Sequence, residues 1–550
     1  MLSTEYVMAV NGMTCDHCEA IVREALEAAG AQHVQASCRR GDARFRVSDN
    51  TDLARLPAAV HAAGYRPGAI ISVQPAADHP RTGSGSNGYD LAIIGSGSAA
   101  FAAAIKARDL GARVVMIERA TLGGTCVNIG CVPSKRLLRA AETFHQAGHH
   151  PFAGIATGTG SVDFGALVTQ KDDLVTQLRQ QKYADLIDVY GWELIQGEAR
   201  FVDEATVTVA GRTITADAYL IATGARPAFP PIPGLAEAGY LTSARAMELD
   251  RLPASLAIIG AGYIALEQGQ IFRHLGSAVT IMQRGPRLLP DYEPEVAEAA
   301  HQMLDRLGTQ VLTGSQIQRV ERTARGRCLH LICDGRMEMI EAEQILVATG
   351  RQPNTDVLNL DQAGVDRDTR GAPVVNEHLR TTNPRIFAAG DVTLAPQFVY
   401  VAAYQGRLAA ENALTATPRA VDLRAVPSVI FTEPQIASVG LTRTQAQAAG
   451  FAVQSTDLPL GAVPRAQVNV ESEGVFVLVA DAASGRLLGV QVVAGNAGEV
   501  IYAATLAVKY GLTVTDLVES FAPYLTMAEG LKLGALSFGR DVAKLSCCAA

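Results

Sequence analysis

The sequence lacks several features that would mark a membrane, nucleic-acid-binding or secreted protein. It has no run of Lys and Arg, which argues against nucleic acid and anionic membrane surfaces as partners. No stretch approaches the roughly 18 uninterrupted apolar residues that span a bilayer, so we expect no membrane span. The first ten residues, MLSTEYVMAV, have no basic segment ahead of an apolar one, unlike a secretory signal. Together these absences predict a cytoplasmic location.

What is present is a chain of ordinary soluble composition with an unusual set of cysteines. Its 550 residues are 48% hydrophobic and 19% charged with a net charge of −8, and this length predicts three or four domains. Nine cysteines without a signal favour a reducing compartment and functional thiols. Thiolate pairs select soft metals, and a dithiol can also cycle through a disulfide. Six of the cysteines form three close pairs, namely Cys15 and Cys18, Cys126 and Cys131, and Cys547 and Cys548.

Residues 1–73 are predicted to form a small module of alternating strands and helices. After this module the chain is rich in Gly, Ser and Pro over residues 74–88 and nearly devoid of large apolar residues, which is typical of a flexible tether. The apolar spacing within the module predicts strands at 5–10, 43–47 and 70–73, and helices at about 17–29 and 53–63.

Two units of strand, glycine turn, helix and strand follow, beginning at residues 89 and 254, and they predict two doubly wound α/β domains. Glycines in such a turn let the backbone approach a pyrophosphate at a helix N-terminus, and an acid at the end of the next strand bonds a ribose hydroxyl. The first unit therefore predicts a dinucleotide site. Its turn residues are Gly95, Gly97, Ala99 and Ala100, and its acid is Glu118.

The second unit differs from the first at the acidic position. Its turn residues are Gly260, Gly262 and Ala265, but Gln283 stands where the acid would be, followed by Arg284 and, close by, Arg287. An acid would repel a 2′-phosphate, whereas an arginine attracts it. The second unit therefore favours NADPH over NADH. From about residue 424 the pattern changes to a hairpin around 484–485 and helical stretches, which predicts an α+β cap or dimer domain.

Residues 123–135, GGTCVNIGCVPSK, contain the second cysteine pair and are the most specific motif of the chain. Together with the two turns and with LIATGARP, LVATGRQPN and IFAAGDV, they resemble the flavin-dependent pyridine nucleotide–disulfide oxidoreductases. The resemblance implies the following division of the chain: an FAD-binding domain in two parts, 89–241 and 352–424, an NADPH-binding domain at 242–351, and a dimerisation domain at 425–550.

The same resemblance implies where FAD lies. Glu118 would contact the adenosine ribose, Asp391 the ribityl chain, and Lys135 would lie near the flavin ring. The cysteines of the motif lie near the start of a predicted helix, where the positive end of the helix dipole lowers thiol pKa values. The other FAD-binding residues that the resemblance implies are Gly95, Gly97, Ala99, Ala100, Gly123, Thr125, Thr223 and Gly224.

A position near the C-terminus separates the branches of this family. Glutathione- and lipoamide-type reductases place a histidine there as the acid or base for an organic disulfide. This chain has Tyr524 in FAPYLTMAEGLKL instead, and no histidine follows His378. Tyr524, the tail LSCCAA and the GMTCDHC near the start resemble the mercuric reductases. Departures are small, since the tail ends in two alanines and the redox loop reads Asn-Ile-Gly at 128–130.

This resemblance implies that NADPH reduces Hg(II) to elemental mercury through FAD. Cys126 would face the substrate and Cys131 the flavin, and Tyr183 and Tyr524 would line the metal site. The tail pair, Cys547 and Cys548, would capture thiol-bound Hg(II) and pass it to the active site of the partner subunit, which makes a homodimer obligatory.

The first module, with Cys15 and Cys18, resembles heavy-metal-associated domains of the ferredoxin-like βαββαβ fold and implies metal delivery. A membrane mercury transporter that hands over Hg(II) is a candidate partner. Half of a zinc site or a redox-active CxxC is the alternative for this module; a structural zinc normally needs four ligands, and the chain has no second CxxC.

Two other functions stay open for the whole chain. One is a flavin disulfide reductase of the glutathione or lipoamide type, against which Tyr524 argues. The other is a non-catalytic soft-metal binding or trafficking protein, against which the intact redox loop and Lys135 argue. The remaining cysteines, Cys38, Cys328 and Cys333, are interpreted as bystanders, because free cysteine is often simply buried. The eleven histidines show no metal-binding spacing.

Overall fold

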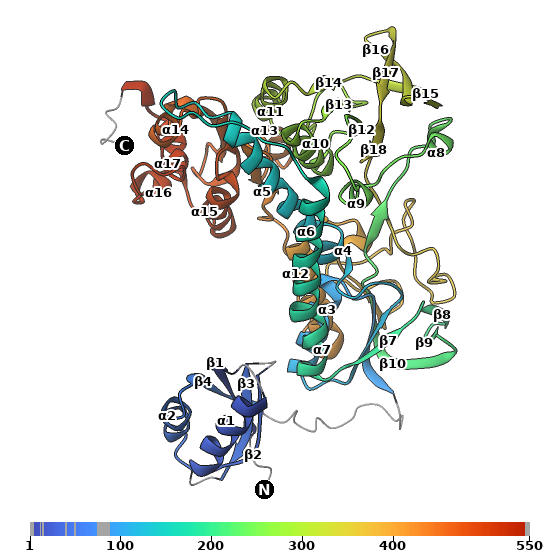
Figure 1. The fold of residues 1–550 in the computed structure, drawn as a ribbon, viewed down its shortest axis with the longest axis vertical. Helices are drawn as coiled ribbons and strands as arrows, with labels where there is room; N and C mark the ends of the chain where they lie inside the picture. The colour runs from blue at the N-terminus through green and yellow to red at the C-terminus, as the bar shows by residue number, and fades with distance from the viewer. Residues whose placement is uncertain are drawn as a thin grey trace.

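The computed structural model describes residues 5–11, 13, 16–38, 41–48, 51–73 and 88–544. The first module is drawn apart from the rest of the molecule in Figure 1. Its antiparallel sheet has the order β2-β3-β1-β4, which is the predicted ferredoxin-like arrangement. The helices bury Val22, Leu26, Leu56 and Val60 against the sheet, so the module has its own core. The bounds are β1 Glu5–Asn11, α1 Asp16–Ala28, β2 Ala31–Ser37, β3 Asp42–Val47, α2 Arg55–Ala62 and β4 Arg66–Val73.

The first nucleotide-binding unit is built on a largely parallel sheet. The apolar strand β5 lies between β6 and β10 and is buried on both faces, as expected for a doubly wound fold. Helix α12 packs closely on α3, because Gly406 has no side chain: a Cβ there would lie 2.0 Å from the carbonyl oxygen of Ala99. The strands are β5 Tyr89–Ile94, β6 Val114–Glu118, β7 Glu193–Gln196, β8 Arg200–Asp203, β9 Thr206–Val209, β10 Arg212–Ile221 and β20 Ile386–Ala388. The helices are α3 Ser98–Asp109, α4 Gly124–Asn128, α5 Cys131–Gly148, α6 Phe164–Arg179, the π-helix η1 Gln180–Ala184, α7 Asp185–Tyr190, the 3-10 helix η2 Asp391–Thr393 and α12 Val399–Leu414.

The second unit repeats this plan with the parallel sheet β14-β13-β12-β18. An antiparallel sheet, β15-β16-β17, projects from it at the end of the molecule away from the C-terminal domain (Figure 1). Its strands and helices are β12 Ser255–Ile259, α10 Tyr263–Leu275, β13 Ala278–Met282, α11 Pro294–Arg306, β14 Gln310–Leu312, β15 Gln316–Thr323, β16 Gly326–Cys333, β17 Arg336–Ala342 and β18 Gln344–Val347. The segments that join the two units are β11 Ala225–Pro227, α8 Leu235–Ala238, α9 Ser243–Ala246 and β19 Arg351–Pro353.

The C-terminal domain contains the predicted hairpin, β24 and β25, within an antiparallel sheet of order β21-β22-β25-β24-β23. Helices α15 and α17 cover this sheet, and α17 packs so closely that a Cβ on Gly530 would lie 2.4 Å from Phe476. The bounds are β21 Ser428–Ile430, β22 Gln435–Gly440, α13 Arg443–Ala448, β23 Val453–Pro459, η3 Leu460–Ala462, α14 Pro464–Asn469, β24 Val475–Asp481, β25 Leu487–Ala494, α15 Ala497–Tyr510, α16 Val514–Glu519, α17 Glu529–Leu536 and η4 Val542–Lys544. The predicted fold class is therefore confirmed.

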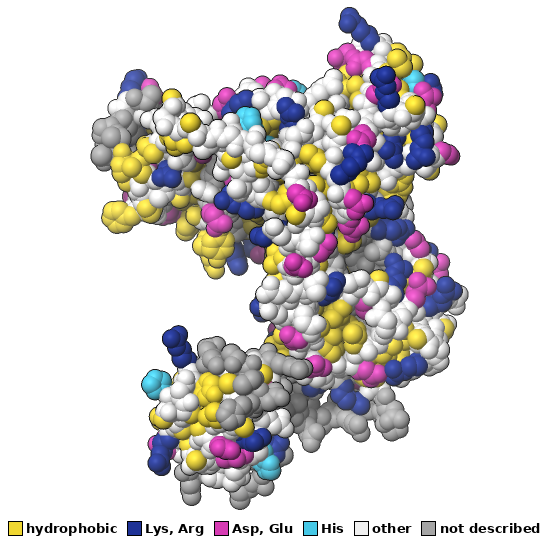
Figure 2. All heavy atoms as spheres, in the orientation of Figure 1, with side chains coloured by type: hydrophobic (Ala, Val, Ile, Leu, Met, Phe, Trp, Pro, Cys, Tyr) yellow, Lys and Arg dark blue, Asp and Glu magenta, His cyan; other side chains and the backbone are white. Residues whose placement is uncertain are grey.

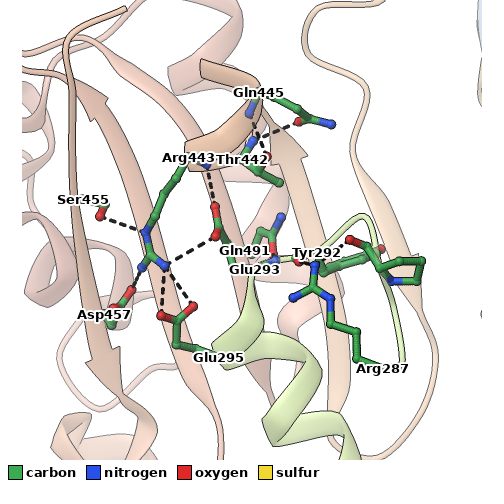
Figure 3. A network of polar contacts seen from close by, with 11 residues as sticks. Arg287, Tyr292, Glu293, Glu295, Thr442, Arg443, Gln445, Ser455, Asp457 and Gln491 are labelled. Carbon is green, nitrogen blue, oxygen red and sulfur yellow. Dashed lines mark hydrogen bonds and ion pairs between the residues drawn. The ribbon is translucent and has the colours of Figure 1, made fainter. Parts of the chain in front are cut away.

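A network around Arg443 joins the C-terminal domain to the second nucleotide-binding unit (Figure 3). Arg443 Nη1 donates to both carboxylate oxygens of Glu295 at 2.9 Å, and its backbone N–H donates to Glu293 at 2.6 Å. Glu293 is buried, and its own N–H donates to Gln491 on β25 at 2.9 Å. Asp457 pairs with the same guanidinium. A buried carboxylate with this many partners fixes the start of α11 on the C-terminal domain.

The C-terminal domain also exposes large apolar side chains. Tyr502 and Tyr510 of α15 are 65% and 70% exposed, and Phe521 in the following loop is fully exposed. Figure 2 shows such side chains gathered on the part of this domain that faces the gap above the first module. Exposed apolar side chains grouped in this way suit a protein–protein contact. Within the described ranges, no helix combines the length and the apolar character needed to cross a bilayer.

Candidate active site

The first glycine turn presents backbone donors at the start of α3. Gly95 has φ +113°, and a Cβ there would lie 2.3 Å from the Ala222 carbonyl oxygen, so the position requires glycine. Gly97 caps α3 without a side-chain hydrogen bond, which leaves the first N–H groups of the helix open to an anion. Ser96 Oγ donates to Glu118 at 2.6 Å and holds this carboxylate beside the turn. The turn therefore fits a pyrophosphate with a ribose next to it.

Two hollows are lined by residues that the sequence predicts to bind the flavin. The larger has a volume of about 480 Å³ and reaches from the glycine turn to the cysteine loop. The smaller lies beside the end of β6 and is lined in part by Gly95, Glu118 and Thr223. Two hollows at one turn suit the two halves of a dinucleotide. The predicted residues that line the larger one are Gly97, Ala99, Thr125, Cys126, Cys131, Lys135, Gly224 and Asp391.

Two of the predicted flavin-site residues do not line the larger hollow but pack next to its wall. Ala100 is fully buried in α3, where it packs in the core and not in the wall. Gly123 has φ +97°, and a Cβ there would lie 2.8 Å from Val127. The next residue, Gly124, needs its small size as well, since a Cβ would lie 2.6 Å from Gly97 Cα. These glycines let the cysteine loop pack directly on the nucleotide turn.

Asp391 lies in the wall of the larger hollow at the start of η2. Burial raises the pKa of its carboxyl, and Arg351, 3.5 Å away, opposes that rise. A carboxylate next to a cation in such a place is suited to accept hydrogen bonds from the hydroxyls of a bound ligand. The residues of both hollows thus fit a flavin dinucleotide.

The redox cysteines belong to two consecutive helices, with Cys126 in the middle of the short α4 and Cys131 at the start of α5. Cys126 is half-buried in α4, and Cys131 begins α5 and is exposed in the single chain. A hydrogen bond from the Cys126 thiol lowers the pKa of Cys131 to about 7; the protein atoms that surround the sulfur in the hollow act against this shift, and the charge of Lys135 acts with it. The same hydrogen bond, together with burial, raises the pKa of Cys126. In the dithiol form the two sulfurs share one proton, and the directions of the two shifts favour the thiolate on Cys131.

Lys135 joins the two nucleotide-binding units at the redox site. Its Nζ lies 2.7 Å from Glu267 Oε2 on α10 and 4.6 Å from the centre of the Phe431 ring. Glu267 is buried, and its other oxygen accepts a hydrogen bond from the Phe431 N–H at 3.1 Å. Both charged residues line the larger hollow. A paired cation is therefore held next to Cys131, where it favours the thiolate.

The second glycine turn has the same backbone geometry and opens on a cavity of about 900 Å³. Gly260 has φ +105°, and a Cβ there would lie 2.4 Å from the Ala348 carbonyl oxygen. Gly262 caps α10 without a side-chain hydrogen bond, and Ala265 is fully buried where the helix meets the sheet. Gln283 and Arg284, as predicted from the sequence, line this cavity.

Arg287 is set apart from this pair. It is not among the residues that line the cavity. Its Nη2 donates to the carbonyl oxygens of Pro290 and Tyr292 at 2.6 and 2.9 Å, as Figure 3 shows. The guanidinium of Arg287 thus holds the loop before α11, and Arg284 is the better placed cation for a nucleotide phosphate.

Tyr183 lies near the redox cysteines, on a π-helical turn between α6 and α7. Burial raises the pKa of its phenol, a hydrogen bond with Ser98 opposes this, and the charges of Cys126 and Cys131 add to it. Its ring packs edge-on against Phe101 with centroids 4.8 Å apart. Single π-helical turns often occur at functional sites, and here the turn places a tyrosine beside the sulfur pair.

Tyr524 lies elsewhere in the single chain. It is 49% exposed in the loop before α17 and is not among the residues that line the flavin hollow. Glu529, at the start of α17, is buried, and burial raises the pKa of its carboxyl while a hydrogen bond from the backbone of Leu525 opposes that rise. The single chain therefore does not bring Tyr524 to its own cysteines.

The structure describes only some of the cysteines at the two ends of the chain that are predicted to bind metal. Cys15, Cys547 and Cys548 lie outside the described residues. Cys18 lies in α1, half-buried against the core of the first module.

The sequence reasoning missed two charged residues of the site. Glu267 pairs with Lys135, and Arg351 faces Asp391. Glu267 had a usable signal, because it is an acid inside the apolar helix that follows the second glycine turn, where an acid needs a partner. Arg351 had no comparable signal in its local sequence.

Two family models match the chain. Residues 89–406 match the pyridine nucleotide-disulphide oxidoreductases, and residues 426–535 match the dimerisation domain of the same family. A solved structure with the same fold is the Cu(II) complex of the HOCl-induced flavoprotein disulfide reductase RclA from Escherichia coli. Its TM-score is 0.74 at 30% identity, over 83% of this chain and 100% of that chain.

Similar sequences extend over the whole chain. The mercuric reductase of Staphylococcus aureus is 54% identical over 100% of both chains. The mercuric reductase of Lysinibacillus sphaericus is 51% identical over 99% of this chain and 100% of its own length. The chain therefore belongs to the mercuric reductases, within the pyridine nucleotide-disulphide oxidoreductase family.

Proposed function

We propose that the protein reduces Hg(II) to elemental mercury with electrons from NADPH, passed through FAD and the Cys126–Cys131 pair. Membership of the family implies a flavin, a pyridine nucleotide and a dimer. The observation that carries the proposal is the sulfur pair itself. In it, Cys131 has a pKa lowered to about 7 and lies in the wall of the flavin hollow together with Cys126. Two such sulfurs are the donor set that a soft cation prefers.

The proposal of FAD for the first unit and NADPH for the second rests on the residues at the ends of β6 and β13. Glu118 stands beside the first turn, where it suits the ribose of an adenosine and hence FAD. Gln283 and Arg284 stand in the second cavity, where the missing acid and the added cation suit a 2′-phosphate and hence NADPH.

The chemistry of the protein's own groups follows from their protonation. Incoming thiol-bound Hg(II) first meets Cys126, the sulfur proposed to face the substrate, which replaces one thiolate ligand; the displaced thiolate leaves with the Cys126 proton. The Cys131 thiolate then replaces the second thiolate ligand, which leaves and takes a proton from water, so that two sulfurs hold Hg(II). When bound, the flavin supplies the two electrons that it has received from NADPH. Hg(II) accepts both and becomes the neutral atom, which thiolates hold poorly.

Tyr524 and the cysteine tail are proposed to serve the partner's site. Tyr524 is exposed and does not reach the flavin hollow of its own chain. It follows an exposed apolar face that includes Tyr502, Tyr510 and Phe521, on the domain that matches the dimerisation model. Burying that face in a dimer would bring Tyr524 into the interface. Cys547 and Cys548, which follow on the same domain, would then pass Hg(II) to the partner's sulfur pair.

Mixed dimers test this exchange between subunits. One subunit carries Cys126→Ala and Cys131→Ala, and the other carries Cys547→Ala and Cys548→Ala, with different affinity tags for purification. Each parent alone should reduce Hg(II) bound to a bulky thiol slowly or not at all. The mixed dimer should recover activity, because one intact sulfur pair meets one intact tail. A mixed dimer as inactive as its parents would show that the tail serves its own chain.

Substrate choice tests the function itself. Oxidation of NADPH is followed in excess thiol while Hg(II), oxidised glutathione and lipoamide are added in turn. We expect oxidation only with Hg(II). Oxidation with either organic disulfide alone would support a disulfide reductase instead. No oxidation with any of the three, in protein that retains its flavin, would support a soft-metal binding protein.

A further inference from the structure

The antiparallel sheet β15-β16-β17 has two faces of different character. Leu329, Leu331 and Cys333 of the central strand β16 are buried in the core of the second nucleotide-binding unit. Cys328 and His330 alternate with them, and side chains alternate between the two faces of a strand. The outer face of this sheet therefore carries a cysteine and a histidine that the proposed mercury chemistry does not use.

A third donor completes a cluster on this outer face. Glu321 of β15 lies directly opposite Cys328 in the register of the sheet. His330 Nε2 is 2.8 Å from Glu321 Oε1 and 3.7 Å from Cys328 Sγ. One ligand atom from each of the three side chains lies within 4.8 Å of the other two. Sulfur, imidazole nitrogen and carboxylate oxygen thus converge at one point.

The spacing of these atoms suits a tetrahedral ion. Around Zn²⁺, with bonds of about 2.3 Å to sulfur and 2.0 Å to nitrogen, the sulfur and nitrogen atoms lie about 3.5 Å apart. The observed separation of 3.7 Å between Cys328 and His330 already matches this geometry. The nitrogen–oxygen separation would have to open from 2.8 Å to about 3.3 Å, a small movement for the exposed Glu321.

A second observation points the same way. Met339 lies opposite His330 in the register of β17, and Met337 lies two residues away on the same face. Their side chains are 67% and 69% exposed, so the thioether sulfurs are accessible from solvent. Thioethers are soft donors. The outer face thus brings together several of the side chains that bind borderline and soft cations.

One group opposes a cation at this place. Arg319 pairs with Glu321, and its Nη2 lies 3.5 Å from His330 Nδ1. Its side chain is 51% exposed, so it can swing into solvent. A cation that binds a cysteine sulfur displaces the thiol proton.

We infer that Cys328, His330 and Glu321 form a second metal site, one that takes a borderline divalent cation such as Zn(II), with Arg319 covering it until the ion arrives. This assignment revises the interpretation of Cys328 as a bystander. The site is separate from the redox pair and holds three protein ligands, which leaves the fourth position of a tetrahedral ion for water. Binding releases the Cys328 proton to solvent, and His330 binds as the neutral imidazole through Nε2.

Calorimetric titration with Zn(II) tests the site. The full chain is used in its oxidised form, with Cys15, Cys18, Cys547 and Cys548 all changed to serine, so that the other cysteine pairs do not compete. We expect one Zn(II) bound per chain, with proton release that shows up as a dependence of the heat on the buffer. Loss of a supporting residue at a metal site costs about 10- to 100-fold in affinity, so losing a ligand by Cys328→Ser or His330→Gln should cost at least that.

Two further variants, made in the same protein with four cysteines changed to serine, distinguish the loss of a Zn(II) ligand from a general change in structure. Cys333→Ser changes a buried cysteine of the same strand on the opposite face and should leave Zn(II) binding unchanged. Arg319→Gln should tighten binding several-fold, because it removes the competing cation. Unchanged binding in Cys328→Ser, or no Zn(II) bound by the parent, would overturn the inference. So would weaker binding in Arg319→Gln, with folding of each variant checked by circular dichroism.

Discussion

The two nucleotide-binding units share the backbone geometry of their glycine turns but differ in the charged residues at the end of the second strand. Gly95 and Gly260 adopt nearly the same conformation, with φ +113° and +105°, and each excludes a side chain through a neighbouring carbonyl. The first unit places Glu118 at the end of its second strand, whereas the second unit has Gln283 and Arg284 after the equivalent strand. The backbone therefore suits a pyrophosphate in both units, and we propose that these side chains decide which nucleotide each one takes.

A further difference is that the cysteine loop belongs to the first unit alone. The second unit contributes to the redox site through Glu267, which pairs with Lys135 across the boundary between the units. Phe431 of the C-terminal domain completes this contact. The redox chemistry is thus placed where the two units and the C-terminal domain meet.

The largest expected effect comes from adding a methyl group to each turn. Gly95→Ala should yield protein without flavin colour, because the new Cβ would collide with the Ala222 carbonyl at 2.3 Å. Gly260→Ala should keep its flavin but lose reduction by NADPH, because its Cβ collides with Ala348. Flavin absorbance and anaerobic reduction by NADPH measure the two outcomes.

Gly276→Ala is the matched control for both variants. Gly276 also has φ +113°, but nothing lies within 4 Å of a Cβ placed there. It should cost stability of about 1–3 kcal/mol through backbone strain and leave both nucleotide sites intact. If Gly95→Ala retained a full complement of flavin, the role assigned to the first turn would be wrong.

The next effect concerns the choice between NADPH and NADH. Arg284→Ala should reduce kcat/KM for NADPH by about 10- to 100-fold, since a hydrogen bond to a charged group contributes about 1.5–3 kcal/mol. The value for NADH should change little. Arg287→Gln serves as the control, because Arg287 is bound to loop carbonyls and does not line the cavity. An equal loss for both nucleotides in Arg284→Ala would contradict the assignment.

A smaller effect is expected in the pH dependence of Cys131. Its pKa of about 7 means that alkylation of the reduced protein should rise as the pH passes through 7. Lys135→Met removes the cation that lowers this pKa, so alkylation at pH 7 should fall several-fold and the curve should move to higher pH. Glu267→Gln removes a charge that raises the same pKa, so its curve should move to lower pH.

Arg136→Gln is the control for this pair of variants. Arg136 is an exposed cation next to Lys135 on α5 and contacts Gln170. Its loss should leave the alkylation curve in place. Movement of the Lys135→Met and Glu267→Gln curves in the same direction would show that structure and not charge sets the reactivity of Cys131.

The smallest effect is expected from removing the first module. It has its own buried core, and one of its contacts with the first unit is the long hydrogen bond from Arg44 to the Val189 carbonyl at 3.5 Å. Deletion of residues 1–73 should leave the flavin content unchanged. The rate of NADPH oxidation with Hg(II) should change by less than about twofold, which corresponds to about 0.5 kcal/mol. A deletion variant that fails to fold would place the domain boundary elsewhere.

Much of the fold could be predicted because its signals are local. Short stretches of sequence predict the apolar strands before Gly95 and Gly260 and the hairpin at 484–485, and the structure confirms them. The cysteine loop was found in the same way, since its glycines and cysteines are neighbours in sequence. Such positions depend on backbone geometry, which glycine dictates.

The rest of the site depends on contacts between distant segments. Lys135 and Glu267 belong to helices of different units, and no local pattern states that they pair. Arg284 and Arg287 look equivalent in sequence, and only the loop before α11 separates them, by binding Arg287 to its carbonyls. Cys328 lies among strand residues, and its neighbour Glu321 becomes visible only through the register of β15 and β16.

The most direct test of the central claim compares elemental mercury released with NADPH consumed. The reaction is run without oxygen, with Hg(II) supplied in excess thiol and the vapour trapped from a gas stream. The account predicts equimolar mercury and NADPH for the unaltered protein, and neither product formation nor NADPH consumption for Cys131→Ser. NADPH consumed without mercury vapour, or vapour that persists in Cys131→Ser, would contradict it.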